Sequence, residues 1–453
     1  MPEIGFYGGA GTVTGSRHLL MSGPERVLVD CGMYQGLKAL RLKNWEPCPF
    51  DAESLPFVVL THTHIDHIGM LPRLVKEGFR GAVICTPATR DLAELLLLDA
   101  AHLQEEDADF LNRKGLSKHS PALPLFDADD VQKTLALMTT RPYGQWTDLP
   151  DRVSFRFRNA GHLLGSAMVE MRVSENGSST TILFSGDLGR LGMPLNPDPE
   201  PPPEVDFMLL ESTYGNRIHC ADSLEDQVER VVLATFKRRG ILVIPAFAVG
   251  RSQQVIYVLN TLMDQGRIPP TPIHLDSPMA VDATEIYRRY PRELEANAEL
   301  KAKNVILHRS LEESKALNSL KGPALLISSS GMLTGGRILH HLKRLLPDDR
   351  NTVVLTGYQA AGTRGRALLE GARHLRIHGS DVPVKAVIED FCGFSGHADA
   401  QETMTWLKGL EKPPRGIFLT HGEPEASAAL AKRIEQEKGW HARVPELGDI
   451  IKL

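Results

Sequence analysis

The most constraining feature of this chain is a cluster of metal-binding side chains directly after an apolar segment. Residues 57–60 are Phe-Val-Val-Leu, which is typical of a buried strand, and Thr-His-Thr-His-Ile-Asp-His-Ile-Gly follows. Side chains at alternate positions of an extended chain lie on one side, so His62 and His64 can converge on one ion. Asp66 and His67, one turn further on, can reach a second. Imidazole and carboxylate are zinc ligands, so the run predicts a metal site at a strand end; the alternative is a polar loop with solvated histidines.

The composition is that of an ordinary globular protein. The chain has 453 residues, 42% of them hydrophobic and 24% charged, and a length of about 150 residues per domain suggests two or three domains. Its 51 basic and 56 acidic residues give a net charge of −5. This balance excludes a basic coat for nucleic acid, so a polyanion would have to bind in a local groove or at metal ions. No apolar run approaches the ~20 residues that span a bilayer, which excludes the membrane as a partner.

The cysteines point to a reducing compartment. The five are Cys31, Cys48, Cys85, Cys220 and Cys392. No two of them are two or three residues apart, which excludes a zinc finger and a paired redox motif. Their odd number, together with the absence of a signal peptide before the first strand, favours buried thiols. We therefore expect a cytoplasmic protein.

The pattern of expected elements changes along the chain. The first part alternates short strands with glycine-rich turns, and its apolar strands at 181–187 and 207–211 end in Asp187 and Glu211. Beyond that point strands alternate with helices, which is typical of a parallel α/β domain. His162 lies between small residues in Asn-Ala-Gly-His-Leu-Leu-Gly-Ser. Alone, His162 and Asp187 are weak candidates because Gly-His and Gly-Asp are common turn pairs, but with the histidine run they form an ordered series of ligands.

Taken in order, these motifs resemble those of the metallo-β-lactamase-fold hydrolases. Within that superfamily the chain resembles the β-CASP nucleases, the family that contains RNase J and the endonuclease subunit that processes mRNA 3′ ends. The four superfamily motifs are matched by Asp30, by the run at 60–69, by His162 and by Asp187. The β-CASP motifs A, B and C are matched by Glu211, by His397 in Gly-Phe-Ser-Gly-His-Ala-Asp, and by His421 in Leu-Thr-His-Gly.

The resemblance covers essentially the whole chain and implies its fold. We expect an α/β protein in which a metallo-β-lactamase αββα sandwich carries an inserted parallel α/β domain, the β-CASP domain. The sandwich is expected at residues 1–211 and 385–453, and the inserted domain at 212–384.

The resemblance also implies two zinc ions per chain, with manganese as a substitute in vitro. One ion has three histidine ligands, the other has a carboxylate and two histidines, and one aspartate bridges them. The implied ligands are His62, His64 and His162 for the first ion, Asp66, His67 and His421 for the second, and Asp187 as the bridge. Asp30 is expected to support the site without binding metal.

Such a zinc pair suits phosphodiester hydrolysis, because it can hold a nucleophilic hydroxide and neutralise the phosphate. His397 is the expected proton donor to the leaving group, with Glu211 orienting it, and Asp66 is counted with them as catalytic. The alternatives are a salt-bridged or helix-capping carboxylate for Glu211 and a surface histidine at a helix start for His397.

Glycine-rich runs in the expected inserted domain are candidates for phosphate contacts. They lie at the carboxyl ends of strands, where ligands of parallel α/β domains bind; the alternative is that they are plain strand-to-helix turns. The candidate substrate-binding residues are Arg251, Ser329, Ser330, Gly331, Arg364 and Arg366.

We therefore expect a zinc-dependent phosphodiesterase that cuts single-stranded RNA, as an endonuclease, a 5′→3′ exonuclease or both. A DNA nuclease of the same family and a small-molecule thioesterase or lactonase of the same fold are the alternatives. A non-catalytic RNA-binding subunit is disfavoured by the complete set of ligands. The sequence leaves open whether the chain acts alone or as a homodimer.

Overall fold

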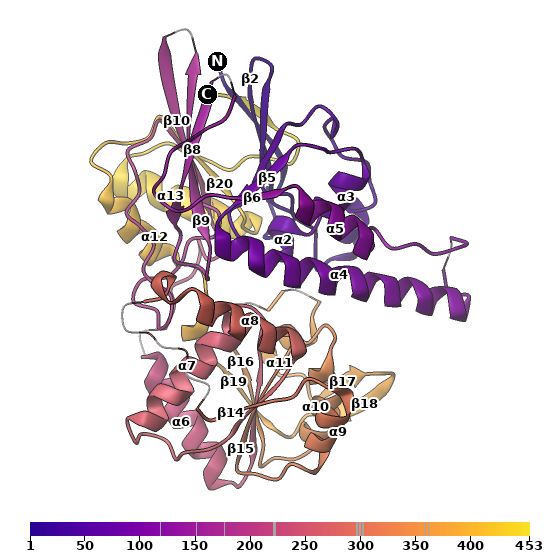
Figure 1. Ribbon diagram of the computed structural model, residues 1–453. Helices are drawn as coiled ribbons and strands as arrows, with labels where there is room; N and C mark the ends of the chain where they lie inside the picture. The colour runs from indigo at the N-terminus through magenta and orange to yellow at the C-terminus, as the bar shows by residue number, and fades with distance from the viewer. Residues whose placement is uncertain are drawn as a thin grey trace. The chain divides into compact units, whose positions relative to one another are not determined.

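The structure is a computed structural model that describes residues 1–117, 119–150, 152–175, 177–220, 223–295, 298, 300, 303–357, 359–360 and 362–453, without the side chain of Cys392. The chain divides into two compact units (Figure 1). The first comprises Met1–Leu191, Asp198–Ile218 and His397–Leu453, and the second Gly192–Pro197 and His219–Gly396. The domain limits expected from the sequence, at residues 211/212 and 384/385, remain a proposal, because the two compact units are defined by contacts and not by family boundaries.

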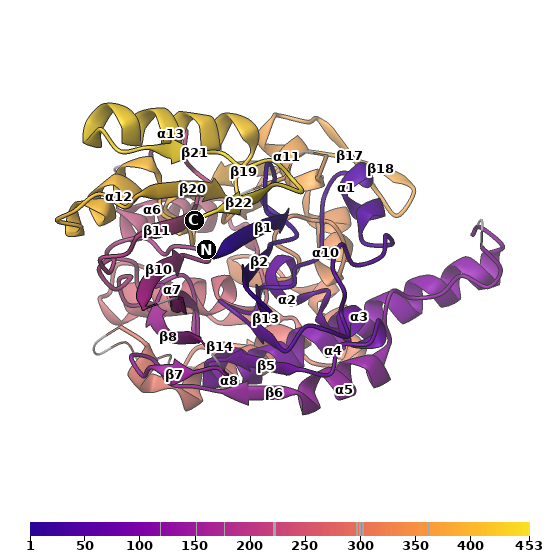
Figure 2. The same ribbon diagram turned by 90° about the horizontal axis from the view of Figure 1, so that it is seen from above.

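The first unit is built on two seven-stranded sheets. The strand order of one sheet is β22-β1-β2-β3-β4-β5-β6, and that of the other is β21-β20-β11-β10-β9-β8-β7. The strands of the first sheet are β1 (Glu3–Gly8), β2 (Arg17–Ser22), β3 (Glu25–Val29), β4 (Phe57–Val59), β5 (Ala82–Cys85), β6 (Met138–Thr140) and β22 (Ile450–Lys452). Those of the second are β7 (Thr147–Asp148), β8 (Val153–Asn159), β9 (Ala167–Glu175), β10 (Ser178–Phe184), β11 (Phe207–Glu211), β20 (Gly416–Thr420) and β21 (Ala442–Arg443). Figure 2 shows both termini at the first sheet, where β22 pairs with β1.

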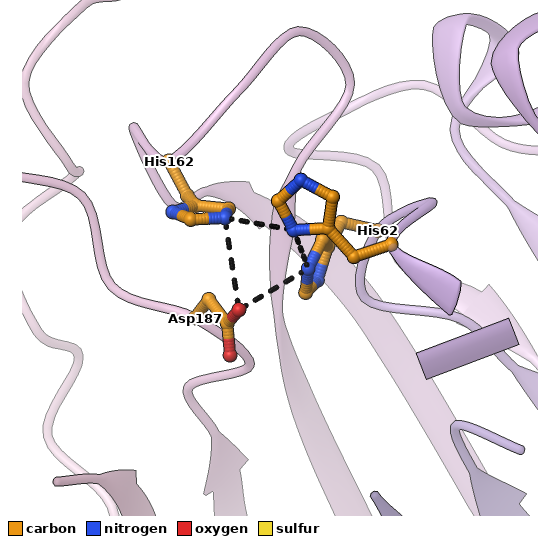
Figure 3. A group of neighbouring side chains, drawn as sticks. His62, His162 and Asp187 are labelled. Carbon is orange, nitrogen blue, oxygen red and sulfur yellow. Dashed lines mark hydrogen bonds and ion pairs between the residues drawn. The ribbon is translucent and has the colours of Figure 1, made fainter. Parts of the chain in front are cut away.

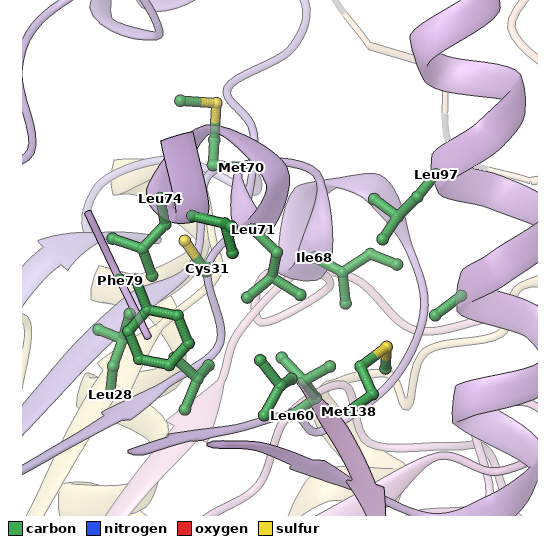
Figure 4. Close-up of a cluster of buried hydrophobic side chains, with 14 of the residues drawn as sticks. Leu28, Cys31, Leu60, Ile68, Met70, Leu71, Leu74, Phe79, Leu97 and Met138 are labelled. Carbon is green, nitrogen blue, oxygen red and sulfur yellow. The ribbon is translucent and has the colours of Figure 1, made fainter. Parts of the chain in front are cut away.

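Alternation along the strands produces four layers. Val59 of β4 packs between the two sheets, whereas its neighbour Val58 faces the helices on the outer side of the first sheet. Figure 4 shows part of this outer cluster, with Leu28 and Leu60 near Ile68 and Leu71. In the second sheet, Phe184 of β10 packs between the sheets and Leu183 faces the opposite helical layer. The helices of this unit are α1 (Lys38–Lys43), α2 (Ile65–Ile68), α3 (Leu71–Lys76), α4 (Pro87–Lys114), α5 (Ala128–Ala136), α12 (Ala400–Trp406) and α13 (Pro424–Lys438), with a 3₁₀ turn η4 (Leu407–Gly409). The expected αββα sandwich is confirmed.

The second unit is the expected parallel α/β domain. Its six-stranded sheet has the order β14-β13-β15-β12-β16-β19, every neighbouring pair is parallel, and a hairpin of β17 and β18 stands apart from it. The central strands β12 and β15 are buried along their whole length, as strands covered on both faces are. The strands are β12 (Ile241–Pro245), β13 (Ile273–Asp276), β14 (Val305–Leu307), β15 (Ala324–Ser328), β16 (Thr352–Leu355), β17 (His374–Ile377), β18 (Ser380–Pro383) and β19 (Val387–Asp390). The helices are α6 (Leu224–Lys237), α7 (Arg251–Asp264), α8 (Pro278–Arg289), α9 (Leu311–Ala316), α10 (Arg337–Leu345) and α11 (Arg364–Leu369), with 3₁₀ turns η1 (Pro291–Glu293), η2 (Leu317–Ser319) and η3 (Cys392–Phe394).

Two expectations from composition meet the structure here. Among the described residues, no helix combines the length and the apolar character needed to cross a membrane. Cys31, Cys48 and Cys85 are free thiols, but Cys220 is disulfide-bonded, so the expectation that all five cysteines are thiols is wrong.

Candidate metal centre

The ends of several strands of the first unit supply the site, and His162 lies in the loop that follows β8. Strands β10, β11 and β20 are parallel neighbours, so their carboxyl ends meet at one sheet edge. Asp187 and His421 lie just beyond β10 and β20, and Glu211 is the last residue of β11. The histidine run follows β4 of the facing sheet, and His64 forms the N-cap of the short helix α2. Residues far apart in the sequence are thereby brought into one buried group.

The first candidate metal site consists of His62, His64, His162 and Asp187, whose ligand atoms lie within 4.8 Å of one another. Nδ1 of His64 is 3.1 Å from Nε2 of His62 and 3.2 Å from Nε2 of His162. Oδ2 of Asp187 is 3.3 Å from His62 Nε2 and 3.6 Å from His162 Nε2 (Figure 3). A tetrahedral zinc ion with Zn–N bonds of about 2.0–2.1 Å separates its ligand atoms by about 3.3 Å. The donor set therefore fits a tetrahedral ion.

The second candidate site consists of Asp66, His67 and His421. Nε2 of His421 lies 3.2 Å from Nε2 of His67 and 3.4 Å from Oδ2 of Asp66. The other oxygen of Asp187, Oδ1, is 3.2 Å from His67 Nε2. Asp187 thus directs one carboxylate oxygen to each group.

The Oδ1 atom of Asp187 gives a test of whether a cation belongs here. It is buried, and although ring nitrogens of His67 and His421 lie 3.2 and 3.3 Å away, it makes no hydrogen bond within the described parts of the chain. A buried carboxylate oxygen without a donor is costly, and a bound cation removes that cost. The residues present therefore fit a metal centre.

Burial keeps the three histidines of the first candidate site in their neutral form. Burial lowers the pKa of His62 to about 3 and that of His64 to about 4, and it also lowers the pKa of His162. These imidazoles are therefore neutral at pH 7, which is the form that coordinates a metal ion. Burial would raise the pKa of Asp187, but the surrounding histidines, His421 and His67 first among them, hold it well below its usual value, so this carboxylate is ionised.

Asp30 lies outside both groups and holds His67 in place. Its Oδ2 accepts hydrogen bonds from His67 Nδ1 at 2.7 Å and from the Thr61 hydroxyl at 2.8 Å, and its Oδ1 accepts from the Thr61 amide at 2.8 Å. With its Nδ1 protonated, His67 directs Nε2 toward the second candidate metal site. Asp30 has a left-handed φ of 62°, which is uncommon outside glycine and typical of constrained sites. Thr61 was not singled out in the sequence, since a threonine among histidines carries no signal of its own.

Glu211 and His397 form a pair beside the metal groups. His397 Nδ1 donates to Glu211 Oε1 at 2.9 Å, and Glu211 also accepts from the amides of Leu188 at 2.8 Å and Thr213 at 3.1 Å. Burial lowers the pKa of His397, but the carboxylates of Glu211 and Asp187 outweigh it and raise the pKa to about 9. His397 is therefore an imidazolium at neutral pH and carries a proton that it can give away.

Two further contacts, one of His397 and one of His421, also bear on the chemistry. His397 also lies within ligand reach of Asp187 and His421, which makes it a geometric alternative as a metal ligand. Its Nδ1 is 3.9 Å from Asp187 but only 2.9 Å from Glu211, so we assign the Nδ1 proton of His397 to the hydrogen bond with Glu211. The Thr213 hydroxyl lies 3.1 Å from His421 Nδ1 and is a second supporting contact that the sequence did not reveal.

Comparison with known proteins places the chain in a family. Family models match at residues 19–234 for the metallo-β-lactamase superfamily, at 252–368 for the Beta-Casp domain, and at 381–445 for the Zn-dependent metallo-hydrolase RNA specificity domain. The chain is 41% identical over 438 residues to Ribonuclease TTHA0252 of Thermus thermophilus, and the match covers 94% of each protein. This chain belongs to the β-CASP family of metallo-β-lactamase-fold hydrolases.

Other relatives of this β-CASP protein carry different names. It is 32% identical over 451 residues to the Transcription termination factor FttA of Methanosarcina mazei, which covers 94% of this chain and 68% of that protein. FttA of Pyrococcus abyssi is also 32% identical, over 476 residues, with 98% and 70% covered. A crystal structure of a protein of unknown function from Enterococcus faecalis V583 aligns over 100% of both chains with a TM-score of 0.56 and 13% identity, which shows a shared fold only.

The candidate phosphate-binding residues all belong to the second unit. Ser329, Ser330 and Gly331 directly follow β15, and the Arg364 guanidinium donates to the carbonyl oxygen of Leu333 at 3.1 Å, just beyond this loop. Gly331 is packed so closely that an added Cβ would lie 3.1 Å from the Phe247 ring.

The two remaining arginines make contacts of their own. Arg251 begins α7, donates to Gln254 Oε1 at 2.7 Å and lies over the Phe394 ring at 5.8 Å. Arg366 donates to Glu370 at 2.6 Å on the exposed side of α11. The serine loop and Arg364 are therefore neighbours, whereas Arg366 is turned to an acidic partner.

Proposed function

We propose that this chain is a zinc-dependent ribonuclease that hydrolyses phosphodiester bonds of single-stranded RNA. The observation that carries the proposal is the position of Asp187, whose two carboxylate oxygens face two separate groups of buried ligands. The name of the Thermus thermophilus relative, which is similar over nearly the whole chain, supports RNA as the substrate. We propose two zinc ions per chain, with manganese as a substitute.

His62, His64 and His162 would hold one ion, Asp66, His67 and His421 the other, and Asp187 would bridge them. When bound, such a pair of ions supplies Lewis acidity that lowers the pKa of water and neutralises charge on the phosphate. Asp30 and Thr213 contact Nδ1 of His67 and His421, which would leave Nε2 of each ring to hold an ion.

The proton for the leaving group would come from His397. We propose that its Nε2–H protonates the 3′-oxygen as the phosphodiester bond breaks, which leaves a 3′-hydroxyl and a 5′-phosphate. Glu211 would keep the imidazolium charged and its ring fixed, because two backbone amides lock the carboxylate. In this proposal Asp66, Glu211 and His397 are the catalytic residues.

The second unit would contribute contacts to RNA phosphates. We propose Ser329, Ser330, Gly331 and Arg364 as the main contacts, since they gather at the carboxyl edge of a parallel sheet. Arg251 and Arg366 are secondary candidates, because each already has a side-chain partner.

We also propose that the β-CASP domain comprises residues 212–384. The proposed location of the protein is the cytoplasm, where RNA is processed.

The decisive experiment digests matched 5′- and 3′-labelled RNA and DNA oligomers with protein of defined zinc content and maps the product ends. We expect RNA to be cut to 5′-phosphate products, Asp187→Ala to be inactive, and the product lengths to distinguish internal from terminal cleavage. Faster cutting of the matched DNA would replace the proposal with a DNA nuclease. Hydrolysis of neither polymer by the zinc-loaded protein would refute it.

A further inference from the structure

The short helix α1 of the first unit buries none of its own side chains. None of its six residues, Lys38–Lys43, is buried, and the flanking Leu37 and Trp45 are 56% and 52% exposed. Isolated helices shorter than about 12 residues are marginal in water, and protein helices gain their stability by packing an apolar face. Only Leu40 and Lys43 are partly buried, so contacts outside the helix contribute much of what holds α1 in place.

That support is a clamp between Tyr34 and Asn44, which stand at the two ends of the segment. The Asn44 side chain accepts from the Tyr34 amide at 2.9 Å and donates to the Tyr34 carbonyl oxygen at 2.8 Å. Both residues are buried. Residues 34–44 thus form a compact loop with closed ends, a type of loop that is frequently functional.

The base of this loop is joined to the candidate metal centre. The amide of Cys31 donates to the carbonyl oxygen of His67 at 2.7 Å, and that of Met33 donates to Ile65 at 2.9 Å. The Tyr34 hydroxyl donates to the carbonyl oxygen of Tyr7 at 3.2 Å. The segment that leads into the loop is therefore hydrogen-bonded to the backbone that carries Asp66 and His67.

The residues of this loop include three cations. Lys38, Arg41 and Lys43 form no ion pair within the described parts of the chain, and the nearest acid in the sequence, Glu46, pairs with none of them. Three unbalanced cations beside an exposed tryptophan, on a chain with a net charge of −5, match a polyanion that carries flat aromatic groups.

We infer that the loop 34–45 is a contact surface for single-stranded RNA, in which Lys38, Arg41 and Lys43 bind phosphates and Trp45 stacks on a base. This inference rests on the proposed ribonuclease function and assigns part of the substrate's path. The exposed Leu37 and Leu42 could also suit a protein partner, but the unbalanced charge favours nucleic acid, and the test below separates the two.

The test compares two pairs of substitutions, each of which removes two exposed helical cations that form no ion pair among the residues that the structure describes. Lys38→Ala with Arg41→Ala alters the loop, whereas Arg113→Ala with Lys114→Ala alters the end of α4 and serves as the control. Binding of a fluorescent single-stranded phosphorothioate RNA, which keeps the backbone charge and resists cleavage, is measured by anisotropy at several salt concentrations with zinc-loaded protein. Each lost phosphate contact should lower the slope of log Kd against log salt concentration by about 0.7.

We expect the loop variant to lose about 1.4 from this slope and the control variant to match the wild type. Trp45→Ala should weaken binding about tenfold without changing the slope, because stacking is not ionic. All variants should hydrolyse bis(p-nitrophenyl) phosphate, which is too small to span the loop and the metal centre, at the wild-type rate.

Four outcomes would overturn the inference. These are an unchanged salt slope in the loop variant, an equal loss in the control, a matching loss of hydrolysis of the small substrate, or a change in oligomeric state by light scattering with RNA affinity intact. A failure of the proposed function is distinct from all of these, because the zinc-loaded wild type would then cut no RNA at all.

Discussion

His397 donates its Nδ1 proton to Glu211 over 2.9 Å, although 186 residues separate the two in the sequence. Glu211 is the last residue of β11, and His397 lies just before α12, where the Ala398 amide is fixed to the Leu188 carbonyl oxygen at 2.8 Å. The same Leu188 donates its amide to Glu211. Leu188, which directly follows Asp187, thus fixes both Glu211 and His397 beside the proposed bridging carboxylate.

The first prediction concerns the proton donor. His397→Ala should slow RNA cleavage by about a hundredfold or more, which is the usual contribution of a general acid, while zinc content stays at the wild-type level. Single-turnover rates and elemental analysis of the same preparation measure both quantities. Since His397 also lies within ligand reach of Asp187 and His421, loss of a full zinc equivalent would instead identify it as a metal ligand.

A second prediction follows from the charge of Glu211. The pKa of His397 is raised to about 9 by the Glu211 and Asp187 carboxylates acting against burial, so its proton is present at pH 7 and is lost as the pH rises through that value. Glu211→Gln removes one of these charges, so the alkaline fall of kcat should begin at a lower pH. The pH profile of the variant is compared with that of Glu204→Gln, an exposed glutamate outside the site. An unmoved alkaline limb would exclude the coupling.

A third prediction concerns the bridge. Asp187→Ala should abolish cleavage and lower zinc content, because the lost carboxylate faces both ligand groups, while the melting temperature of the apoprotein stays close to that of the wild type. Apoprotein is the proper comparison, since bound metal stabilises only the folded wild type. Near-normal turnover in this variant would show that the aspartate is not the bridge.

Much of the architecture followed from the periodicity and order of motifs. The alternation of strands and helices after Glu211 predicted a parallel α/β domain, and the ends of apolar strands predicted where His62 and Asp187 would lie. Local patterns failed where pairing decided the structure. The sequence of residues 127–140 has the pattern of a single charged helix, but α5 ends at Ala136 and Met138–Thr140 forms β6, because this segment pairs with β5.

The supporting contacts of the site could not be predicted from local sequence. Thr61 and Thr213 act through hydrogen bonds to Asp30 and His421, which lie 31 and 208 residues away. Threonine hydroxyls have no spacing rule of the kind that histidine ligands follow. The roles expected for Glu211 and His397 came from the family resemblance alone, and the contact between them is visible only in the fold.

A fourth prediction concerns Gly32, whose backbone lies against the segment that carries Asp66. A Cβ on Gly32 would lie 1.6 Å from the Asp66 carbonyl oxygen and 2.7 Å from the Ser16 amide nitrogen, both of which are backbone atoms. Gly32→Ala should therefore displace the segment that carries Asp66, with loss of zinc and a lower melting temperature. Gly335→Ala is the matched control, because nothing lies within 4 Å of its added Cβ. Equal zinc content in the two variants would contradict this account.

The last prediction concerns stability rather than catalysis, and it uses Glu293 in the second unit. Its Oε2 is buried and has no hydrogen-bond partner among the residues that the structure describes. Burial raises the pKa of Glu293 to about 7, compared with 4.5 for the ordinary side chain. The folded state therefore prefers the protonated acid. The stability that this preference gives is fully present below about pH 4.5, and it is lost as the pH rises through about 7.

Glu293→Gln keeps the shape of the side chain and removes its charge, so the variant should be more stable than the wild type at pH 8 and equal to it near pH 4.5. The expected gain in melting temperature at pH 8 is on the order of 2 °C, measured by calorimetry with metal removed so that binding does not contribute. Glu295→Gln, two residues further on and exposed, should change neither value. A gain of the same size at both pH values would mean that the substitution acts through packing or hydrogen bonding instead of through the ionisation of Glu293.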